Sequence, residues 1–483
     1  MLGSSSPCFI CLVNNTISNF SGHAIVLGAS ISGLLAARVL ADTFHTVTVV
    51  ERDTLPDGPV PRRGAPQARH PHALLARGAR TLDELFPGIL AELAAAGAPV
   101  WDDGDLSKVY ACFGGHLMPH SGTAGLDDVE ANAMYQPSRP LLEHRIRRRV
   151  KALGNVQILD GLDAAELITT EDRRRITGVR TVSHVSGTEH ELSTDLVVDA
   201  MGRGARTPAL LEAFGYGRPI EHHIHVRTTY VSQKLRMAPG SLQELLVNIS
   251  PAPDRPLGMF LVRYEDDTWI FTVSGMAGVQ PPHQLAQMVD FVEKFSPPHL
   301  LNAVRNAEPL GPTVSHRLPS SQWRRYDKMR RFPEGLLVTG DAMCSFNPIY
   351  GQGMSVAAAD ALALQHALRH GTRGLARRYF TEAAKSIAVA WNLGAGSDLA
   401  FPEVEGRRTP MTRLTNAFSD WLLAACETDR AVHARFLMVA GLIEPPSSLL
   451  SPPILVRAAR ANWRRPQDVR HGPVAEDAGS LRP

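Results

Sequence analysis

The sequence has few cysteines, no long apolar run and almost no net charge, and each shortage excludes a class of protein. Five cysteines in 483 residues are too few and too scattered for a disulfide framework, so we expect a reducing, cytoplasmic location. No apolar run approaches the roughly 18 residues that a membrane span requires. The formal net charge is +2, so the chain lacks the basic field that attracts nucleic acid. We therefore expect no nucleic-acid partner.

The two ends of the chain also lack recognisable signals. Residues 1–22 have neither a basic flank nor a cleavage site, so we expect a disordered leader rather than a secretory signal. Cys8 and Cys11 form a C-x-x-C pair, but no second pair completes a zinc site, and we predict no metal. Residues 467–483 are polar with glycine and proline, which predicts a disordered tail.

What the sequence does contain, near its start, is a glycine turn between a strand and a helix. The segment "HAIVLGASISGLLAARVL" is followed by a second strand, "HTVTVVERD", and this order is the context that a dinucleotide-binding motif requires. Gly28 allows the tight turn, and Gly33 lets the helix pack closely on the sheet. Small Ala29 and Ser30 leave the backbone open to a pyrophosphate at the helix N-terminus.

The second strand of this unit ends on an acidic residue. Glu51 stands 51 − 28 = 23 residues after Gly28, near the spacing at which a carboxylate accepts hydrogen bonds from ribose hydroxyls. We count Glu51 and the adjacent Arg52 among the cofactor-binding candidates.

A second glycine turn follows a buried strand in "LLVTGDAMCSFNPIYGQGMSVAAADALAL". The strand ends on Gly-Asp, a proline fixes the turn, and an alanine-rich helix begins at the second glycine of G-Q-G. A helix N-terminus stabilises negative charge by roughly 0.3–1 kcal/mol, so this turn suits an anionic group. The candidate residues here are Asp341, Pro348, Gly351, Gln352, Gly353 and Met354.

Together the two turns resemble the FAD-dependent monooxygenases of the para-hydroxybenzoate hydroxylase fold, whose second FAD motif reads G-D-A-x(5)-P-x-x-G-Q-G. The resemblance implies an α/β fold with a Rossmann-like FAD-binding domain, an inserted antiparallel-sheet substrate domain and a helical C-terminal region. It also implies that Asp341 binds a ribityl hydroxyl of FAD and that the glycine-turn amides face the pyrimidine edge of the flavin. In "YQPSRPLLEHRIRRRV", Arg139 would lie over the ribityl chain or pyrophosphate.

The same resemblance predicts a discontinuous FAD-binding domain over 23–100, 131–206 and 310–400. The substrate domain would comprise 101–130 and 207–309, where "HIHVRTTYVSQKLR" and "LGMFLVRYEDDTWIFTVSG" have strand spacing around a hairpin turn. We expect a helical region over 401–466. Its basic amphipathic segment is more consistent with docking onto the FAD domain than with lying on a membrane surface.

One signature departs from the family pattern. Relatives that reduce their own flavin with NAD(P)H carry "DLVVGADGxxSxxR", but this chain has "DLVVDAMGRGART". Met201 replaces the usual aspartate, and Asp199 stands two residues earlier. We therefore expect electrons from NAD(P)H to arrive either directly or through a separate flavin reductase.

Two further comparisons refine the resemblance. The W-x-W-x-I-P motif of halogenases is absent, with Trp269 the nearest candidate, which argues against halogenation. The segments "GRGARTP", "PQARHPHALLARG" and "FNPIYGQGM" look like an actinobacterial branch that includes epoxidases of polyether antibiotic pathways.

The catalytic residues stay unassigned, because flavin chemistry needs no protein nucleophile. The loop after the second strand lines the ligand crevice in such folds, and its Arg63 and His72 are the candidates we name, beside Arg62, Gln67 and His70. Glu221, His223 and His225 fall on one strand face, which we interpret as polar surface rather than a metal site. We read the basic residues Arg145, Arg147, Arg148, Arg149 and Lys151 as a solvated helix face.

The resulting hypothesis is a monooxygenase that inserts one oxygen atom from O2 into a lipophilic small molecule, by epoxidation or hydroxylation, through a C4a-hydroperoxyflavin. The mostly apolar substrate half favours a lipophilic substrate. Two alternatives stay open: an FAD-dependent reductase of prenyl-type double bonds, and a flavin-holding protein without turnover.

Overall fold

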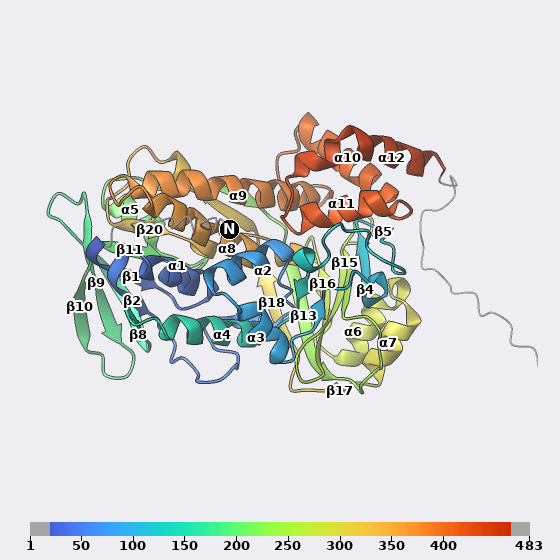
Figure 1. Cartoon of the computed structure of the whole chain (residues 1–483), viewed down its shortest axis with the longest axis horizontal. Coiled ribbons are helices and arrows are strands. Elements are labelled where there is room, and N and C mark those ends of the chain that lie inside the picture. Colours follow the sequence, from blue (N-terminus) through green and yellow to red (C-terminus); the bar gives the residue numbers. More distant parts are fainter. Residues whose placement is uncertain (1–19, 465–483) are drawn as a thin grey trace, which may run out of the picture.

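The computed structural model describes residues 20–464, which form a parallel sheet, a larger mixed sheet beside it and a helical C-terminal region (Figure 1). The first strand begins at Phe20, so the last three residues of the expected leader belong to the sheet. The rest of that leader, the Cys8–Cys11 pair and the expected tail over 467–483 lie outside the described residues.

Five parallel strands form the first sheet, in the order β20-β11-β1-β2-β7. The apolar runs of the inner strands are buried on both faces, as parallel strands require, whereas the edge strand β7 is half-buried. The carboxyl ends meet at one edge, where ligands of such sheets bind. The strands are β1 (Phe20–Leu27), β2 (Phe44–Val50), β7 (Val156–Leu159), β11 (Leu196–Asp199) and β20 (Leu336–Val338).

Helices enclose the parallel sheet and complete its hydrophobic core. Helix α1 packs against α8 and α4, and α8 packs against α9. In Figure 1, α9 runs across the upper left of the molecule, above α8. The alanine-rich sequence of α8 allows these close helix contacts because its side chains are small. The helices are α1 (Ile31–Ala41), α2 (Ala76–Leu85), α3 (Ile89–Ala95), α4 (Arg139–Lys151), α5 (Thr207–Ala213), α8 (Gly353–Leu368) and α9 (Leu375–Asp398).

The second sheet has eight strands, in the order β17-β13-β16-β15-β14-β4-β5, with β18 paired to β13. All pairs are antiparallel except β14 with β4, and the expected hairpin joins β15 to β16. The strands are β4 (Val109–Phe113), β5 (His116–Leu117), β13 (Thr228–Arg236), β14 (Leu246–Ile249), β15 (Leu257–Arg263), β16 (Thr268–Gly275), β17 (Glu308–Pro309) and β18 (Val314–Leu318).

The two faces of this sheet have different partners because side chains alternate along a strand. Odd-numbered residues of β14 to β16, such as Val247, Leu261 and Val273, form a core with α6 (Leu285–Val292) and α7 (Pro298–Arg305). Even-numbered residues of the same strands line a cavity. The sheet therefore serves as a wall between a helical layer and an internal chamber.

The C-terminal helices lie above the β4–β5 edge of the eight-stranded sheet (Figure 1). They are α10 (Pro410–Cys426), α11 (Arg430–Ala440) and α12 (Pro452–Trp463). Their apolar residues share a cluster with Ala111 and Met118 of the sheet region, so the helices pack on the eight-stranded sheet rather than on the parallel sheet. No helix in the described part of the chain is long and apolar enough to cross a membrane.

Smaller sheets complete the structure. Strands β8 (Leu162–Thr169), β9 (Ile176–Ser183) and β10 (Glu189–Ser193) form an antiparallel sheet at the left edge of Figure 1. The remaining strands are β3 (Val100–Trp101), β6 (Met134–Tyr135), β12 (Ile220–Ile224), β19 (Ser321–Arg325) and β21 (Cys344–Ser345).

Candidate active site

A cavity of about 810 Å³ begins at the carboxyl ends of the parallel strands and continues along the inner face of the eight-stranded sheet to α11. Its size falls within the range typical of ligand sites. Segments far apart in the sequence share its lining, because the parallel sheet brings both glycine turns to one edge.

Most of the cofactor-binding candidates lie on this cavity. Four candidate residues do not line it: Ala29, Gly33, Gln352 and Arg63. The candidates that do are Gly28, Ser30, Glu51, Arg52, His72, Arg139, Asp341, Pro348, Gly351, Gly353 and Met354.

The first glycine turn is tightly packed against its own surroundings. Gly28 has φ +102°, and a Cβ there would lie 2.7 Å from the carbonyl oxygen of Ala200. A Cβ on Gly33 would lie 1.9 Å from the oxygen of Gly28, which no side chain can occupy. Both positions therefore require glycine for packing, independently of any ligand.

Glu51 already holds the protein's own groups. Its Oε2 accepts a hydrogen bond from Ala29 N–H at 2.7 Å, and its Oε1 accepts one from Asp53 N–H at 3.0 Å. The guanidinium of Arg62 lies 3.3 Å from Oε1. Because each carboxylate oxygen has two acceptor sites, Glu51 can still meet a ribose hydroxyl, but its position is fixed before any ligand arrives.

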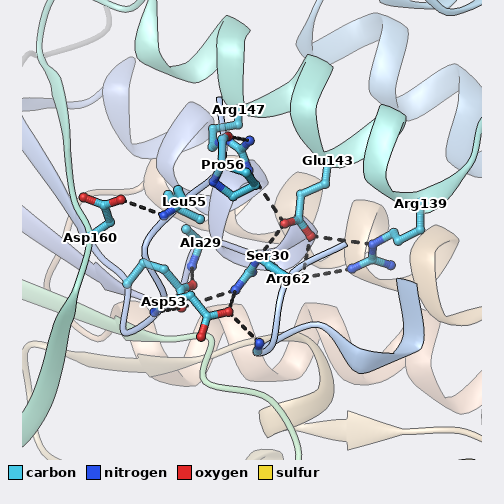
Figure 2. A network of polar contacts seen from close by, with 12 residues as sticks. Ala29, Ser30, Asp53, Leu55, Pro56, Arg62, Arg139, Glu143, Arg147 and Asp160 are labelled. Carbon is cyan, nitrogen blue, oxygen red and sulfur yellow. Dashed lines mark hydrogen bonds and ion pairs between the residues drawn. The ribbon is translucent and has the colours of Figure 1, made fainter. Parts of the chain in front are cut away.

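Arg62 is the centre of the buried polar network in Figure 2. Its Nε donates to Glu143 Oε1 at 2.7 Å, and its Nη1 donates to Asp53 Oδ2 at 3.0 Å. Although burial opposes it, the carboxylates of Glu143 and Glu51 raise the pKa of Arg62. The network pins the loop after β2 to helix α4.

Arg147 corrects the expectation of a solvated basic face on α4. Only 4% of Arg147 is exposed, and its guanidinium donates to the carbonyl oxygen of Pro56 (Figure 2). The i, i+4 spacing from Glu143 places Arg147 on the inward face of the helix. The run of arginines made the whole helix face look solvated, although helical periodicity turns every third or fourth residue toward the protein interior.

Arg139 connects the first turn to the cavity. It is the first residue of α4, and its Nη2 donates to Ser30 Oγ at 2.9 Å. Burial lowers the pKa of Arg139, while the charges of Glu143 and Asp341 oppose that shift. Its Nε makes no hydrogen bond among the described residues and lies 3.7 Å from Glu143 Oε2, an ion-pair distance, so the side chain retains a hydrogen-bond donor for a ligand.

Asp341 lies deep in the molecule, with its carboxylate exposed to the cavity. Burial raises its pKa, and the nearby charges of Arg139 and Arg203 oppose that shift. Within residues 20–464 no group donates a hydrogen bond to this carboxylate. Asp341 therefore has its full accepting capacity available.

The second glycine turn leaves open space, in contrast to the first. No described atom lies within 4 Å of a Cβ built on Gly351 or Gly353, and both glycines line the cavity. Gly351 has φ +66°, which turns the chain into α8. The start of α8 therefore borders open space in the cavity that a planar ring could occupy.

Helix α9 holds this second turn from behind. Asp398 is fully buried, and its Oδ1 accepts hydrogen bonds from Asn347 Nδ2 at 2.9 Å and from Tyr350 OH at 2.8 Å. Burial raises the pKa of Asp398 to about 7, and the two donors oppose that shift. The side chain of Gln352 is also buried, with Oε1 unpartnered in the described chain.

In the segment "DLVVDAMGRGART", Asp199 does not supply the cavity with the carboxylate that the resemblance led us to expect at Met201. Asp199 is buried, and its carboxylate accepts hydrogen bonds from Met201 N–H at 2.9 Å and from Thr207 Oγ1 at 2.5 Å. It therefore shapes its own loop, whereas Met201 lines the cavity.

The structure places two polar rings that the sequence did not indicate, Tyr230 and His316, beside the candidate His70. His70 lies 4.6 Å from Tyr230 and 5.9 Å from His316, measured between ring centroids, and all three line the cavity. His70 Nδ1 is bonded to Ser232 Oγ at 2.8 Å. Burial, and after it the charges of His316, His72 and Arg69, lowers the pKa of His70 to about 3.

His72 is fixed next to this group. Its backbone N–H donates to Tyr264 OH at 2.5 Å, and its Nδ1 is bonded to the carbonyl oxygen of His70 at 2.9 Å. Burial and then Arg139 lower the pKa of His72 to about 4. Tyr230 and His316 could not be found from sequence, because they stand on strands whose pairing partners are remote.

The Glu221 strand face lies apart from the cavity. Glu221 accepts hydrogen bonds from Gln322 Nε2 at 2.8 Å and from Arg324 Nε at 3.3 Å, and it lies 3.0 Å from His223 Nε2. His225 stacks on His223 with 6.0 Å between ring centroids. In residues 20–464 no group of three potential ligands is arranged to hold a metal ion.

These residues fit an FAD molecule. Arg139 has an unpartnered donor and Asp341 an unengaged carboxylate among the described residues, and two open glycines precede a helix N-terminus on the same cavity. Phosphates, ribityl hydroxyls and the flavin pyrimidine edge need these donors, acceptors and amides.

Comparison with known proteins agrees with the fold. No family model matches the chain. The chain is 38% identical over 470 residues to Protein Rv3254 of Mycobacterium tuberculosis, which covers 95% of this chain and 98% of that protein.

Solved structures of flavin enzymes have a similar backbone. The flavin-dependent brominase Bmp2 gives a TM-score of 0.64 at 14% identity, covering 91% of this chain and 99% of that one. The p-nitrophenol 4-monooxygenase PnpA of Pseudomonas putida gives 0.61 at 16% identity, covering 89% and 99%. At such low identity the likeness concerns the fold.

Proposed function

We propose that this chain, which belongs to the same family as Protein Rv3254 of Mycobacterium tuberculosis, is an FAD-dependent monooxygenase acting on a lipophilic small molecule. The observation that carries the proposal is the continuity of the cavity. It joins both glycine turns to the inner face of the eight-stranded sheet, so a cofactor held by the turns meets a substrate held by the sheet.

The residues have separate tasks in this proposal. Ser30 and Arg139 would hold the pyrophosphate, Glu51 the ribose, and Asp341 the ribityl chain. The amides at Gly353 and Met354 would stabilise negative charge at the pyrimidine edge. When bound, FAD supplies the chemistry that activates O2 and transfers one oxygen atom.

The sheet and α11 would position the substrate and exclude water. Apolar side chains such as Phe113, Phe260 and Leu437 line the chamber, which favours a lipophilic substrate. A dry chamber prevents side reactions with water.

The polar rings favour epoxidation over hydroxylation of a phenol. A histidine with a pKa of about 3, such as His70, takes up a phenolic proton poorly, since phenols ionise near pH 10. Epoxidation of an alkene requires no such base. This reading keeps the resemblance to polyether-pathway epoxidases as the proposed branch.

Electron supply is proposed to come from NAD(P)H through a separate flavin reductase. This part depends on Met201, which lines the cavity, and on Asp199, which is engaged in its own loop.

The test begins with protein incubated with excess FAD and then freed of unbound FAD. We expect bound flavin that NADPH alone bleaches slowly, that NADPH with a flavin reductase bleaches rapidly, and that O2 then reoxidises. Reoxidation by a prenyl-type alkene without O2 would instead support the reductase. Flavin that neither system bleaches would support the flavin-holding protein, and failure to bind FAD would refute all three.

A further inference from the structure

The cavity wall changes in character across the eight-stranded sheet. On β13, β16 and β18 the lining residues are polar apart from Leu318; the polar ones are Tyr230, Thr272, Ser274 and His316. On β15, β14 and β4 they are Phe260, Val262, Leu246, Asn248, Val109, Ala111 and Phe113. The chamber is thus polar near Asp341, whose charge acts on Tyr230, and mostly apolar at the other end.

The two ends are well separated. Between β13 and β4 the sheet has four strand-to-strand steps, which at about 4.8 Å each correspond to roughly 19 Å. A substrate that is oxidised beside the second glycine turn can therefore extend far along the wall.

Helix α11 closes the apolar end. Its residues His433, Leu437, Met438, Ala440 and the following Gly441 line the cavity, and the spacing of all but Met438 places them on one face of the helix. Phe436 contacts Phe113 of β4 with 5.5 Å between ring centroids. At its end, α11 is held to α2 by a hydrogen bond from Arg77 N–H to the carbonyl oxygen of Gly441, at 3.2 Å.

His433 is the exception on this apolar face. It is only 2% exposed, and its Nδ1 is buried with no hydrogen-bond partner in the described part of the chain. Burial lowers its pKa to about 4, so the ring is neutral near pH 7. A buried polar group without a partner is costly, and a ligand that supplies one recovers that cost.

We propose that His433 anchors the remote end of the substrate through a hydroxyl group, so that the substrate is a long lipophilic alcohol oxidised at its opposite end. This inference rests on the proposed function for the oxidised end, but the anchor itself is a binding property of α11. A neutral imidazole has one donor and one acceptor nitrogen, which matches a hydroxyl. It offers no charge to a carboxylate.

The test uses three probes that share one ring system: 2-naphthol, naphthalene and 2-naphthoate. Their dissociation constants are measured by equilibrium dialysis against protein incubated with excess FAD. We expect 2-naphthol to bind about tenfold more tightly than naphthalene, the gain of one hydrogen bond to a buried group. 2-Naphthoate should bind more weakly than 2-naphthol.

Variants locate the effect. His433→Leu should remove the preference for 2-naphthol and leave naphthalene binding unchanged, and His433→Gln should retain part of the preference. His144→Leu is the matched control, because His144 also has a buried, unpartnered Nδ1 within the described residues but does not line the cavity.

An unchanged tenfold preference in His433→Leu, or equal binding of 2-naphthol and naphthalene to the parent protein, would overturn the anchor. If His433→Leu does not fold, His433→Gln and the parent protein still decide the matter. These outcomes are distinct from failure of the proposed function, because dialysis requires neither reduction nor O2.

Discussion

The two glycine turns that meet at the edge of the parallel sheet are built in opposite ways. At the first turn, Gly28 and Gly33 are packed against backbone, and Glu51 is bound by the protein's own amides. At the second turn, Gly353 opens into the cavity and Asp341 has no hydrogen-bond donor among the described residues. The groups of the first turn are packed against and bonded to other parts of the chain. The second turn has open space and a carboxylate that can still accept hydrogen bonds from a ligand. Similar motifs can therefore play different energetic roles.

The largest expected effect comes from removing the central arginine of the ion-pair network beside the first turn. Arg62→Met leaves the carboxylates of Glu51 and Asp53 without their cation and removes the nearest of three arginines from Glu143, which costs about 3–5 kcal/mol of unfolding free energy. Urea unfolding of FAD-free protein measures it. Arg63→Met is the matched control, because Arg63 is exposed and should change stability by less than about 0.5 kcal/mol. Equal losses in both variants would contradict the role of the network.

The second prediction compares one alanine substitution at the two turns. Gly33→Ala forces a Cβ against the oxygen of Gly28 and should cost about 1–3 kcal/mol or more of stability. Gly353→Ala meets no described atom within 4 Å and should leave FAD-free protein as stable as the parent. Thermal unfolding measures both. A large destabilisation by Gly353→Ala would show that the second turn, like the first, is closely packed in the protein without a ligand.

The third prediction tests the free carboxylate. Asp341→Asn keeps the shape of the side chain and removes its charge, so FAD should dissociate about 10- to 100-fold more readily, as expected for loss of a charged hydrogen bond. FAD-free protein should lose no stability, since that carboxylate has no donor in the described chain. Fluorescence titration with FAD measures the affinity. Unchanged affinity would remove Asp341 from the site, and Asp290→Asn on the exposed surface of α6 serves as control.

The last prediction concerns the support behind the second turn. The pKa of Asp398 is about 7 in the fold and near 3.9 in an unfolded chain, so the unfolded carboxyl loses its proton first as the pH rises. Stability from this residue is therefore present below pH 4 and is lost between about pH 4 and pH 7.

Asp398→Asn removes that pH dependence and retains an oxygen acceptor for Asn347 and Tyr350. At pH 8 the variant should be more stable than the parent by at least about 1.4 kcal/mol, the value of one pKa unit, and the difference should vanish near pH 4. Urea unfolding across this pH range measures it. A difference that does not change with pH would refute the raised pKa.

The sequence was sufficient for many of the elements and for much of the lining of the candidate site because both depend on local patterns. The strand–glycine–helix order correctly predicted β1, α1 and β2, and the Gly-Asp turn predicted the start of α8 at Gly353. Parallel strands bring their carboxyl ends to one edge, which is why residues as far apart as Ser30 and Asp341 line one cavity.

What the sequence could not provide depends on pairing between distant segments. Tyr230 and His316 come together because β13 pairs with β18, and no local pattern encodes that register. Arg147 looked solvated within an arginine run, but a buried carboxylate on its own helix draws it inward. His433 gave no signal at all, since a single histidine in an amphipathic helix is ordinary until its surroundings are known.

The central claim is that the second glycine turn has open space and hydrogen-bonding groups without partners in the described chain, and that FAD fills that space and supplies those partners. The most direct measurement is a titration of FAD into the parent protein and into Gly353→Ala, with visible absorbance and thermal unfolding recorded at each step. The account predicts one FAD per chain and a rise in melting temperature for the parent, and weak binding by a variant that is equally stable without FAD. A parent protein that stays colourless and unstabilised, or a Gly353→Ala variant that binds FAD as tightly, would contradict it.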